Sequence, residues 1–296
     1  MAAKLPKRLR RLGLGLSTVL GLGARGFFIP YAQAAGIARP QPPNPVIEAL
    51  FAARVPAFQG VLDGLDAYGA DFAAIGGQPP PAPRWDQGWF ARLDAAVAYA
   101  MVRERRPQRI VEVGSGHSTR FLARAVADGG LATRITAIDP QPRRALTGLA
   151  VDHLACTAQQ APADAFAGLA PGDILFIDSS HILMPGTDLD LLFGQVLARL
   201  PAGVLIHIHD IFLPDDYPPS WHWRGYNEQQ AVAALLAAGA VRPLFAAHYA
   251  TTRLADKVAA SAAGPLPLAA GTFETSLWLE KTADAWTAPA NVTNPW

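Results

Sequence analysis

The sequence predicts an α/β fold built on a doubly wound, mostly parallel sheet of seven strands. Short apolar runs rich in β-branched residues alternate with longer segments whose apolar residues recur at helical spacing. One such run, Arg109–Val113, breaks into the turn Gly114-Ser115-Gly116, and the next run ends in the acidic residue Asp139. Sheets of this kind bind ligands at the carboxyl ends of their strands. The sequence therefore predicts a nucleotide site where Arg109–Val113 ends.

The individual elements follow from the same patterning. A helix is expected over residues 86–106, where apolar residues recur every three or four positions until Pro107 stops them. We expect strands over residues 110–113, 135–138, 153–157, 174–178, 204–209, 241–249 and 272–279, the last two as a closing pair. We expect the intervening helices over residues 119–127, 142–149, 162–169, 188–200 and 227–238.

An N-terminal helical and proline-rich extension precedes this domain. Residues 36–83 are rich in proline on both sides of one helical patch at residues 46–58. This composition is typical of a connector that wraps a main domain and has no core of its own. We therefore divide the chain into an N-terminal segment with its connector, residues 1–85, the main domain, residues 86–285, and a C-terminal tail, residues 286–296.

The first residues are basic and then apolar, which allows three interpretations. Basic side chains precede the apolar stretch of residues 12–22, as in a signal peptide, and such a segment can also lie on an anionic membrane surface or pack on the enzyme. Arg25 interrupts the apolar stretch, which is too short to span a bilayer comfortably. We favour packing and a cytoplasmic protein, with peripheral membrane contact through the N-terminus as the alternative.

Net charge and cysteine content narrow the class of protein. A formal net charge of +1 argues against a nucleic-acid binder, since phosphate contacts require an excess of clustered Lys and Arg. Cys156 is the only cysteine, so neither an intrachain disulfide nor a thiolate metal cage can form. This fits a reducing compartment. Oligomeric state does not follow from the sequence.

The residues around the glycine turn indicate which nucleotide binds. Gly-x-Gly alone is a weak signal, but here it follows a strand, opens a helix and is joined by Asp139. Thr119 stands where a dinucleotide fingerprint has its third glycine, and Glu112 places a carboxylate beside the turn, which suits a cationic amino group better than phosphate. The segment resembles class I S-adenosylmethionine-dependent methyltransferases, whose first motif reads acidic-x-Gly-x-Gly and whose second strand ends in an acidic residue.

The resemblance implies a Rossmann-like methyltransferase fold and S-adenosylmethionine as cofactor. It implies that Glu112 and the backbone of the glycine turn hold the methionine part and that Asp139 binds the ribose hydroxyls. Gln159, just past the third strand, is assigned to the neighbourhood of the adenine. The full set of cofactor-binding residues expected on this basis is Glu112, Gly114, Ser115, Gly116, His117, Ser118, Asp139 and Gln159.

A second group of polar residues follows the fourth and fifth strands. The fourth strand ends in Asp178, with His181 three residues on, and the fifth runs into His209 and Asp210. Neighbouring parallel strands would bring these four residues around one cleft. His207 shares a strand with His209, and we assign it a structural role. For the other histidines, hydrogen-bonded structural roles are the alternative to catalysis.

Two chemical uses suit this cluster. Oxygen and imidazole ligands can hold a divalent ion that lowers the pKa of a substrate hydroxyl, while a histidine removes the proton. The sequence Asp-x-Ser-His also resembles metal-dependent small-molecule O-methyltransferases, which implies His181 as general base. The expected metal ligands are Asp178, His209 and Asp210, with His209 also a catalytic candidate; an imidazole ligand suits Mg²⁺ less well than a transition metal.

The segment after Asp210, residues 211–228, is rich in aromatic residues and proline. Directly beyond a strand end, it is predicted to be either a lid or substrate wall, or an aromatic plug over the edge of the sheet. Arg224, Asn227 and Glu228 are polar enough to orient a substrate.

Together these features predict a methyltransferase that acts on a small-molecule acceptor, by O-methylation in preference to N-methylation. Two alternatives use the same fold. One is an NAD-dependent oxidoreductase, and the other is a non-catalytic membrane-peripheral module whose basic N-terminus is the functional end.

Overall fold

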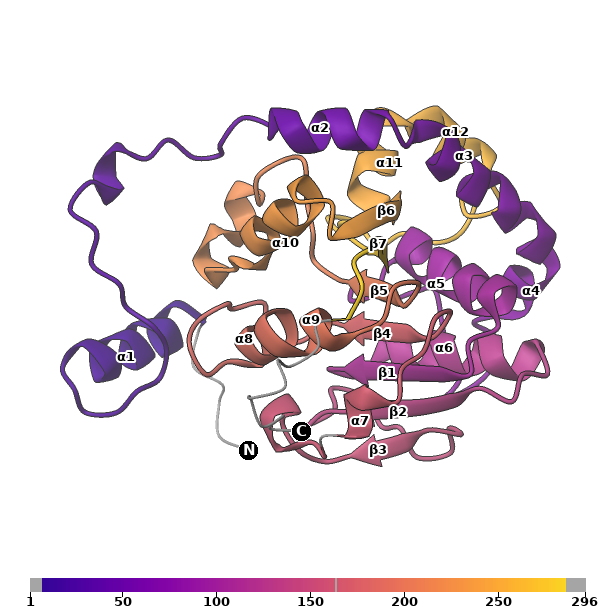
Figure 1. Cartoon of the computed structure of the whole chain (residues 1–296), viewed down its shortest axis with the longest axis horizontal. Coiled ribbons are helices and arrows are strands. Elements are labelled where there is room, and N and C mark those ends of the chain that lie inside the picture. Colours follow the sequence, from indigo (N-terminus) through magenta and orange to yellow (C-terminus); the bar gives the residue numbers. More distant parts are fainter. Residues whose placement is uncertain (1–6, 163, 286–296) are drawn as a thin grey trace. The chain divides into compact units, whose positions relative to one another are not determined.

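The computed structural model describes residues 7–162 and 164–285 (Figure 1). The chain forms two compact units, Met1–Arg39 and Pro40–Trp296. Residues 286–296, predicted to be a C-terminal tail, lie outside the described residues. The predicted domain boundaries at residues 85 and 285 stay predictions.

The second unit contains a seven-stranded sheet in the order β3-β2-β1-β4-β5-β7-β6, which Figure 1 shows from bottom to top. Its strands are β1 (Arg109–Val113), β2 (Arg134–Ile138), β3 (Asp152–Leu154), β4 (Ile174–Ile177), β5 (Leu205–Ile208), β6 (Val241–Ala246) and β7 (Leu277–Lys281). The first five strands in this order pair in parallel, and β7 runs antiparallel to both β5 and β6. The predicted fold class is confirmed.

The described residues form helices in both units, α1 in the first and the others in the second. They are α1 (Lys7–Val19), α2 (Pro45–Ala52), α3 (Val55–Gly64), α4 (Gly69–Ala74), α5 (Arg92–Arg105), α6 (His117–Asp128), α7 (Asp164–Ala167), α8 (Asp188–Leu191), α9 (Leu197–Arg199), α10 (Glu228–Ala237), α11 (Ala247–Arg253) and α12 (Ala255–Ala260). A π-helical turn, Leu192–Val196, joins α8 to α9, so the helix predicted over residues 188–200 is nearly continuous. Short 3₁₀ turns lie at Ala34–Gly36, Leu65–Tyr68, Ala158–Gln160 and Pro219–Arg224.

The connector before the main domain is helical and shares its core. Figure 1 shows α2, α3 and α4 running around the top and right of the unit towards α5. Phe51 and Phe58 are fully buried, and their rings lie 5.5 Å from Tyr249 and 5.9 Å from Phe245, respectively. The connector therefore has no separate core, as predicted, but it contributes more regular structure than its prolines suggested.

One predicted element is wrong, and the strand predicted over residues 241–249 is three residues too long. Residues 142–149 form no helix, because two prolines at one end and Gly148 with a φ of +89° at the other leave too few residues to offset helix nucleation. Residues 247–249 belong to α11 and not to a strand, since pairing with β7 ends at Ala246 and an alanine-rich segment follows. The helix expected at 162–169 shortens to α7, and the last strand begins at Leu277, later than expected.

The first unit contains α1, whose apolar side chains Leu9, Leu12 and Leu16 are exposed. Among the described residues, no single helix is both long and apolar enough to cross a membrane. One pair of helices, Pro45–Ala52 and Val55–Ala74, which meet at a bend, is together long and apolar enough to cross a membrane, judged by length and composition alone. Signal, membrane-surface and packed roles for the N-terminal segment all stay predictions.

A close backbone approach joins the ends of β1 and β4. Gly114 follows β1 with a φ of +81°, and a Cβ atom placed there would lie 1.8 Å from the carbonyl oxygen of Asp178. Backbone hydrogen bonds stabilise this edge of the sheet: the Gly114 amide donates to the carbonyl of Ile138, and the Asp178 amide donates to the carbonyl of Val113. Only glycine meets both demands, a left-handed backbone and direct contact with a neighbouring strand end.

We expect Gly114→Ala to lose more than about 3 kcal/mol of the free energy of unfolding, because β1 and β4 must separate to admit the methyl group. Gly130→Ala is the matched control, since Gly130 also has a positive φ but nothing lies within 4 Å of its added Cβ. The control should lose only about 1–2 kcal/mol from backbone strain. Chemical denaturation measures both, and equal losses would contradict the close-contact argument.

Candidate functional site

The carboxylate of Glu112 lies at the end of β1, fully buried beneath the glycine turn. Its Oε1 atom accepts a 2.6 Å hydrogen bond from Ser118 Oγ, whereas Oε2 has no hydrogen-bond partner among the described residues. Burial raises the pKa of Glu112 to about 8, despite hydrogen bonds from Ser118 and Thr119 that oppose the shift. An unpartnered buried carboxylate oxygen fits an incoming cationic group such as an ammonium.

Asp139 closes the other side of the turn. One of its oxygens accepts hydrogen bonds from the amide of Ser115 at 2.8 Å and from its hydroxyl at 3.0 Å, and the other accepts from the amide of Gln141. Thr119 Oγ1 accepts from the amide of Gly116, so this threonine holds the turn where a dinucleotide site would have glycine. Oδ2 of Asp139 already accepts two hydrogen bonds, so only Oδ1 keeps a lone pair for a ribose hydroxyl.

Three predicted cofactor residues face protein groups. Ser118 bonds to Glu112, and the ring of His117 lies against Arg144, at 3.1 Å between Nε2 and the guanidinium Nε. Gln159 is exposed and donates to the carbonyl of Gly186. The cofactor roles of all three stay predictions.

The four residues predicted from the fourth and fifth strands do come together. His181 Nε2 lies 3.4 Å from Asp178 Oδ1 and 3.4 Å from Asp210 Oδ2, while His209 Nδ1 lies 3.5 Å from Asp178 Oδ1 and 3.4 Å from Asp210 Oδ1. Both histidines are nearly buried, but the side chain of Asp178 keeps 27 % of its surface exposed. The group, called the carboxylate–imidazole cluster below, is therefore open to solvent at Asp178.

Backbone strain marks the same place. His181 and Asp210 have φ values of +60° and +59°, which non-glycine residues seldom adopt. Asn227 holds the first of these loops, because its backbone amide donates to the His181 carbonyl and its side-chain amide pairs with both backbone groups of Leu183. Strained residues of this kind persist when surrounding contacts fix them, and they concentrate at functional sites.

Two further acidic residues support the cluster from behind. Glu228, at the start of α10, lies 2.6 Å from His181 Nδ1, and Asp94, in the first turn of α5, lies 3.3 Å from His209 Nε2. The sequence suggested Glu228 for substrate contact and gave Asp94 no role, because acidic residues are common in first helical turns. Both carboxylates are 0 % exposed. This burial is what marks Asp94 and Glu228 as partners of the two histidines, and it cannot be seen in the sequence.

The charges around His181 decide its protonation. Burial would lower the pKa of His181, but the carboxylates of Glu228, Asp210 and Asp178 outweigh burial and hold its pKa well above the ordinary value. The pKa of His209 is also held well above its ordinary value. Burial would lower it, but the carboxylates of Asp178, Asp210 and Asp94 raise it by more.

His207 has the structural role assigned to it. Its ring stacks on Phe176 at 3.6 Å, and its Nε2 lies 2.8 Å from Ser276 Oγ. Burial, then the neighbouring His209, holds the pKa of His207 well below its ordinary value, so the ring is neutral.

The aromatic segment after Asp210 is buried at its start and lies beside His181 at its end; the lid or substrate-wall role stays a prediction. Phe212 and Tyr217 are buried, as a plug requires, whereas Tyr226 lies over the ring of His181 at 4.4 Å. Arg224 stacks on Trp221 at 3.7 Å and lies 3.9 Å from Asp210. The far end of the segment thus borders the carboxylate–imidazole cluster.

No group of three or more His, Cys, Asp or Glu side chains in residues 7–162 and 164–285 is arranged to hold a metal ion. In the cluster the imidazole nitrogens stand between the carboxylates as ion-pair partners. The ligand set Asp178, His209 and Asp210 stays a prediction.

Residues 111–211 match the family model Methyltransf_24, described as a methyltransferase domain. No curated protein matches the chain. The match gives no support to an NAD-dependent oxidoreductase or to a non-catalytic module.

Several solved structures are similar in outline. The SAH-bound methyltransferase PaMTH1 of Podospora anserina is 16% identical with a TM-score of 0.42, covering 87% of this chain and 100% of that one. The O-methyltransferase TomG of Streptomyces achromogenes, involved in tomaymycin synthesis and in complex with SAM, is 18% identical with a TM-score of 0.40, covering 75% of this chain and 90% of that one. An O-methyltransferase of Bacillus cereus in complex with SAH is 13% identical with a TM-score of 0.39, covering 80% and 100%.

TM-scores this low do not establish a shared activity. The family match stands on its own, and it agrees with the sheet order and with the carboxylates beside the glycine turn. Together these observations identify residues 111–211 as similar to a methyltransferase domain.

Proposed function

We propose that the enzyme methylates a hydroxyl oxygen of a small molecule at the carboxylate–imidazole cluster. The observation that carries this proposal is the position of His181, whose Nδ1 is held by buried Glu228 while its Nε2 faces Asp178 and Asp210. A ring fixed on one side by a carboxylate can accept a proton on the other.

The donor site lies directly beside this cluster. We assign the amino group of the donor to Glu112 Oε2, which has no hydrogen-bond partner among the described residues, and its ribose to Asp139, which bonds to the glycine turn. S-adenosylmethionine supplies an electrophilic methyl group when bound. Since Gly114 touches the backbone of Asp178, the donor turn and the acceptor cluster share one edge of the sheet. The protein then contributes mainly by placing the acceptor oxygen in line with that methyl group.

Each side chain of the cluster has a distinct part. The step requires neutral His181, the form present above its raised pKa: the acceptor hydroxyl then donates to Nε2, and the proton moves to this nitrogen as the oxygen attacks. Glu228 stabilises the resulting imidazolium through Nδ1, and its charge makes His181 a stronger base. We assign Asp178, the least buried of the four, to orienting the acceptor, and His209, which Asp94 holds, to fixing both carboxylates.

We expect His181→Ala to lower kcat by roughly 10²–10⁴-fold, since the general base is lost. The dissociation constant of S-adenosylhomocysteine should change less than about twofold, because His181 does not touch the donor turn. Added imidazole should restore part of the activity. Methyl transfer from labelled S-adenosylmethionine measures kcat, and full activity without imidazole would remove His181 as the base.

We expect Glu228→Gln to shift the acidic limb of the kcat profile to lower pH, because loss of a carboxylate lowers the pKa of His181. The turnover at high pH should also fall, since the imidazolium loses its partner. A variant with a wild-type pH profile would show that Glu228 is only structural.

The pKa of Glu112 predicts how cofactor affinity depends on pH. Below its pKa of about 8 the carboxyl is protonated and cannot pair with an ammonium, so affinity for S-adenosylhomocysteine should rise as pH increases from about 6 to about 8. Glu112→Gln should bind more weakly and lose this dependence. Binding of 5′-methylthioadenosine, which lacks the amino group, is the control and should not change with pH. A pH-dependent Glu112→Gln variant would contradict the assignment.

Metal assistance is a separate proposal, which rests on the ligand chemistry of Asp178, His209 and Asp210. If it is correct, EDTA should abolish methyl transfer and Mg²⁺, Mn²⁺ or another divalent ion should restore it. An enzyme indifferent to EDTA leaves these residues with the ion-pair roles seen in the structure.

A further inference from the structure

His117, Arg120 and Arg144 lie together at the first turn of α6, apart from the carboxylate–imidazole cluster, and the charge of Arg84 acts on two of them, His117 and Arg120. His117 and Arg120 stand one turn apart on α6, Arg144 comes from the segment between β2 and β3, and Arg84 comes from the chain before α5. Arg144 donates to His117 Nε2 at 3.1 Å, and Arg120 donates to the carbonyl of Ala145 at 3.1 Å. We call this group the basic cluster.

The positive charges of the basic cluster are not compensated by the protein. Besides burial, the causes that lower the pKa of Arg120 are the charges of Arg144 and Arg84 alone. His117 is affected in the same way, by burial first and then by Arg144, Arg120 and Arg84, to a pKa of about 4. Within the described residues no carboxylate pairs with Arg84, Arg120 or Arg144. Like charges gathered in this way disfavour the empty state.

Two buried nitrogen atoms of the cluster also have no partner. Arg120 is only 4% exposed, and its Nε is buried without a hydrogen-bond partner among the described residues. His117 is 5% exposed, and its Nδ1 atom is likewise buried without a hydrogen-bond partner among the described residues. Because neutral His117 accepts from Arg144 at Nε2, its proton sits on Nδ1. Both unpartnered groups are therefore donors, and buried donors normally have acceptors.

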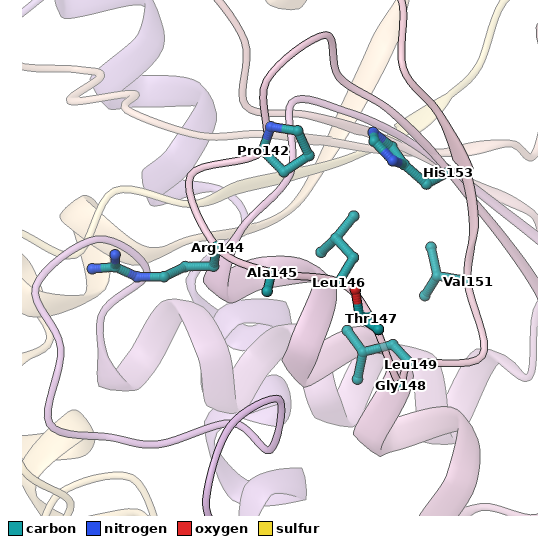
Figure 2. A pocket seen from close by; sticks show the side chains of 9 residues that line it. All are labelled: Pro142, Arg144, Ala145, Leu146, Thr147, Gly148, Leu149, Val151 and His153. Atoms are coloured by element: carbon teal, nitrogen blue, oxygen red, sulfur yellow. The ribbon is translucent and has the colours of Figure 1, made fainter.

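The side chain of Arg144 points towards α6. A cavity of about 450 Å³ lies between residues 142–151 and His153. Figure 2 shows Arg144 at its rim with the guanidinium extending away from the other lining side chains. The ligand of the basic cluster is accordingly expected at α6 and not in this cavity.

We propose that the basic cluster is an anion-binding subsite for a carboxylate or phosphate group of a small ligand. The start of α6, whose N-cap Gly116 has no side chain to cap it, adds the positive end of a helix of 12 residues to the arginine charges. Since His117 directly follows the glycine turn, the anion is either the carboxylate of the methyl donor or that of a second ligand; the first source rests on the proposed donor site.

The experiment compares Arg144→Ala with its neighbour Arg143→Ala. Both arginines are exposed, so neither substitution should unfold the protein, and Arg143 lies over Trp89 at 5.0 Å, outside the cluster. Isothermal titration of the full chain uses three probes: S-adenosylhomocysteine, 5′-methylthioadenosine, which lacks the carboxylate, and inorganic phosphate.

If the donor's carboxylate binds here, Arg144→Ala weakens S-adenosylhomocysteine roughly tenfold or more and leaves 5′-methylthioadenosine unchanged, because one charge-assisted interaction is lost. If a second ligand binds here, wild-type enzyme binds phosphate and Arg144→Ala loses that binding, with S-adenosylhomocysteine unaffected. Arg143→Ala should match the wild type in both cases.

The proposal is overturned if Arg144→Ala and Arg143→Ala bind all three probes alike. Failure of wild-type enzyme to bind the two adenosine compounds would count against the donor site and leave the phosphate comparison valid.

Discussion

The contact between Gly114 and the carbonyl of Asp178 is the constraint on which the site depends. It places the turn after β1 against the end of β4, with no room for a side chain between them. Because the same strand end carries the carboxylate of Asp178, the glycine turn and the carboxylate–imidazole cluster are fixed relative to each other by backbone packing. A methyl transfer requires this kind of fixed geometry, since its rate depends on the alignment of two reactants.

Buried charge is the second constraint. Burying a carboxylate or an imidazolium is costly unless an opposite charge lies close, and here Glu228 and Asp94 compensate His181 and His209. The arrangement also keeps His181 strongly basic. Glu112 and the basic cluster differ, because they are left without an opposite charge. We infer that a bound ligand supplies the missing opposite charge at both Glu112 and the basic cluster.

Much of the fold follows from local patterns that the sequence carries. The strand–turn–helix around Gly114 and the order of elements depend on apolar spacing and on glycine, both visible in the sequence. The segment at 142–149 was mispredicted because its apolar residues resemble a helix, while proline and Gly148 prevent one.

The site itself was only partly predictable. Asp178 and His181 could be placed because strand ends of a parallel sheet converge. Asp94 could not, since its partner His209 lies 115 residues away and only tertiary packing brings α5 beneath β5. Arg120 and Arg144 were likewise hidden, because isolated arginines on a helix and a loop resemble ordinary surface residues.

A crystal structure of the enzyme with S-adenosylhomocysteine is the most direct test that donor and acceptor sites share one edge of the sheet. The account predicts the ligand's amino group on Glu112 Oε2, its ribose at Asp139 and its sulfur facing the space between Asp178 and His181. An amino group away from Glu112, or a sulfur directed away from His181, would contradict it.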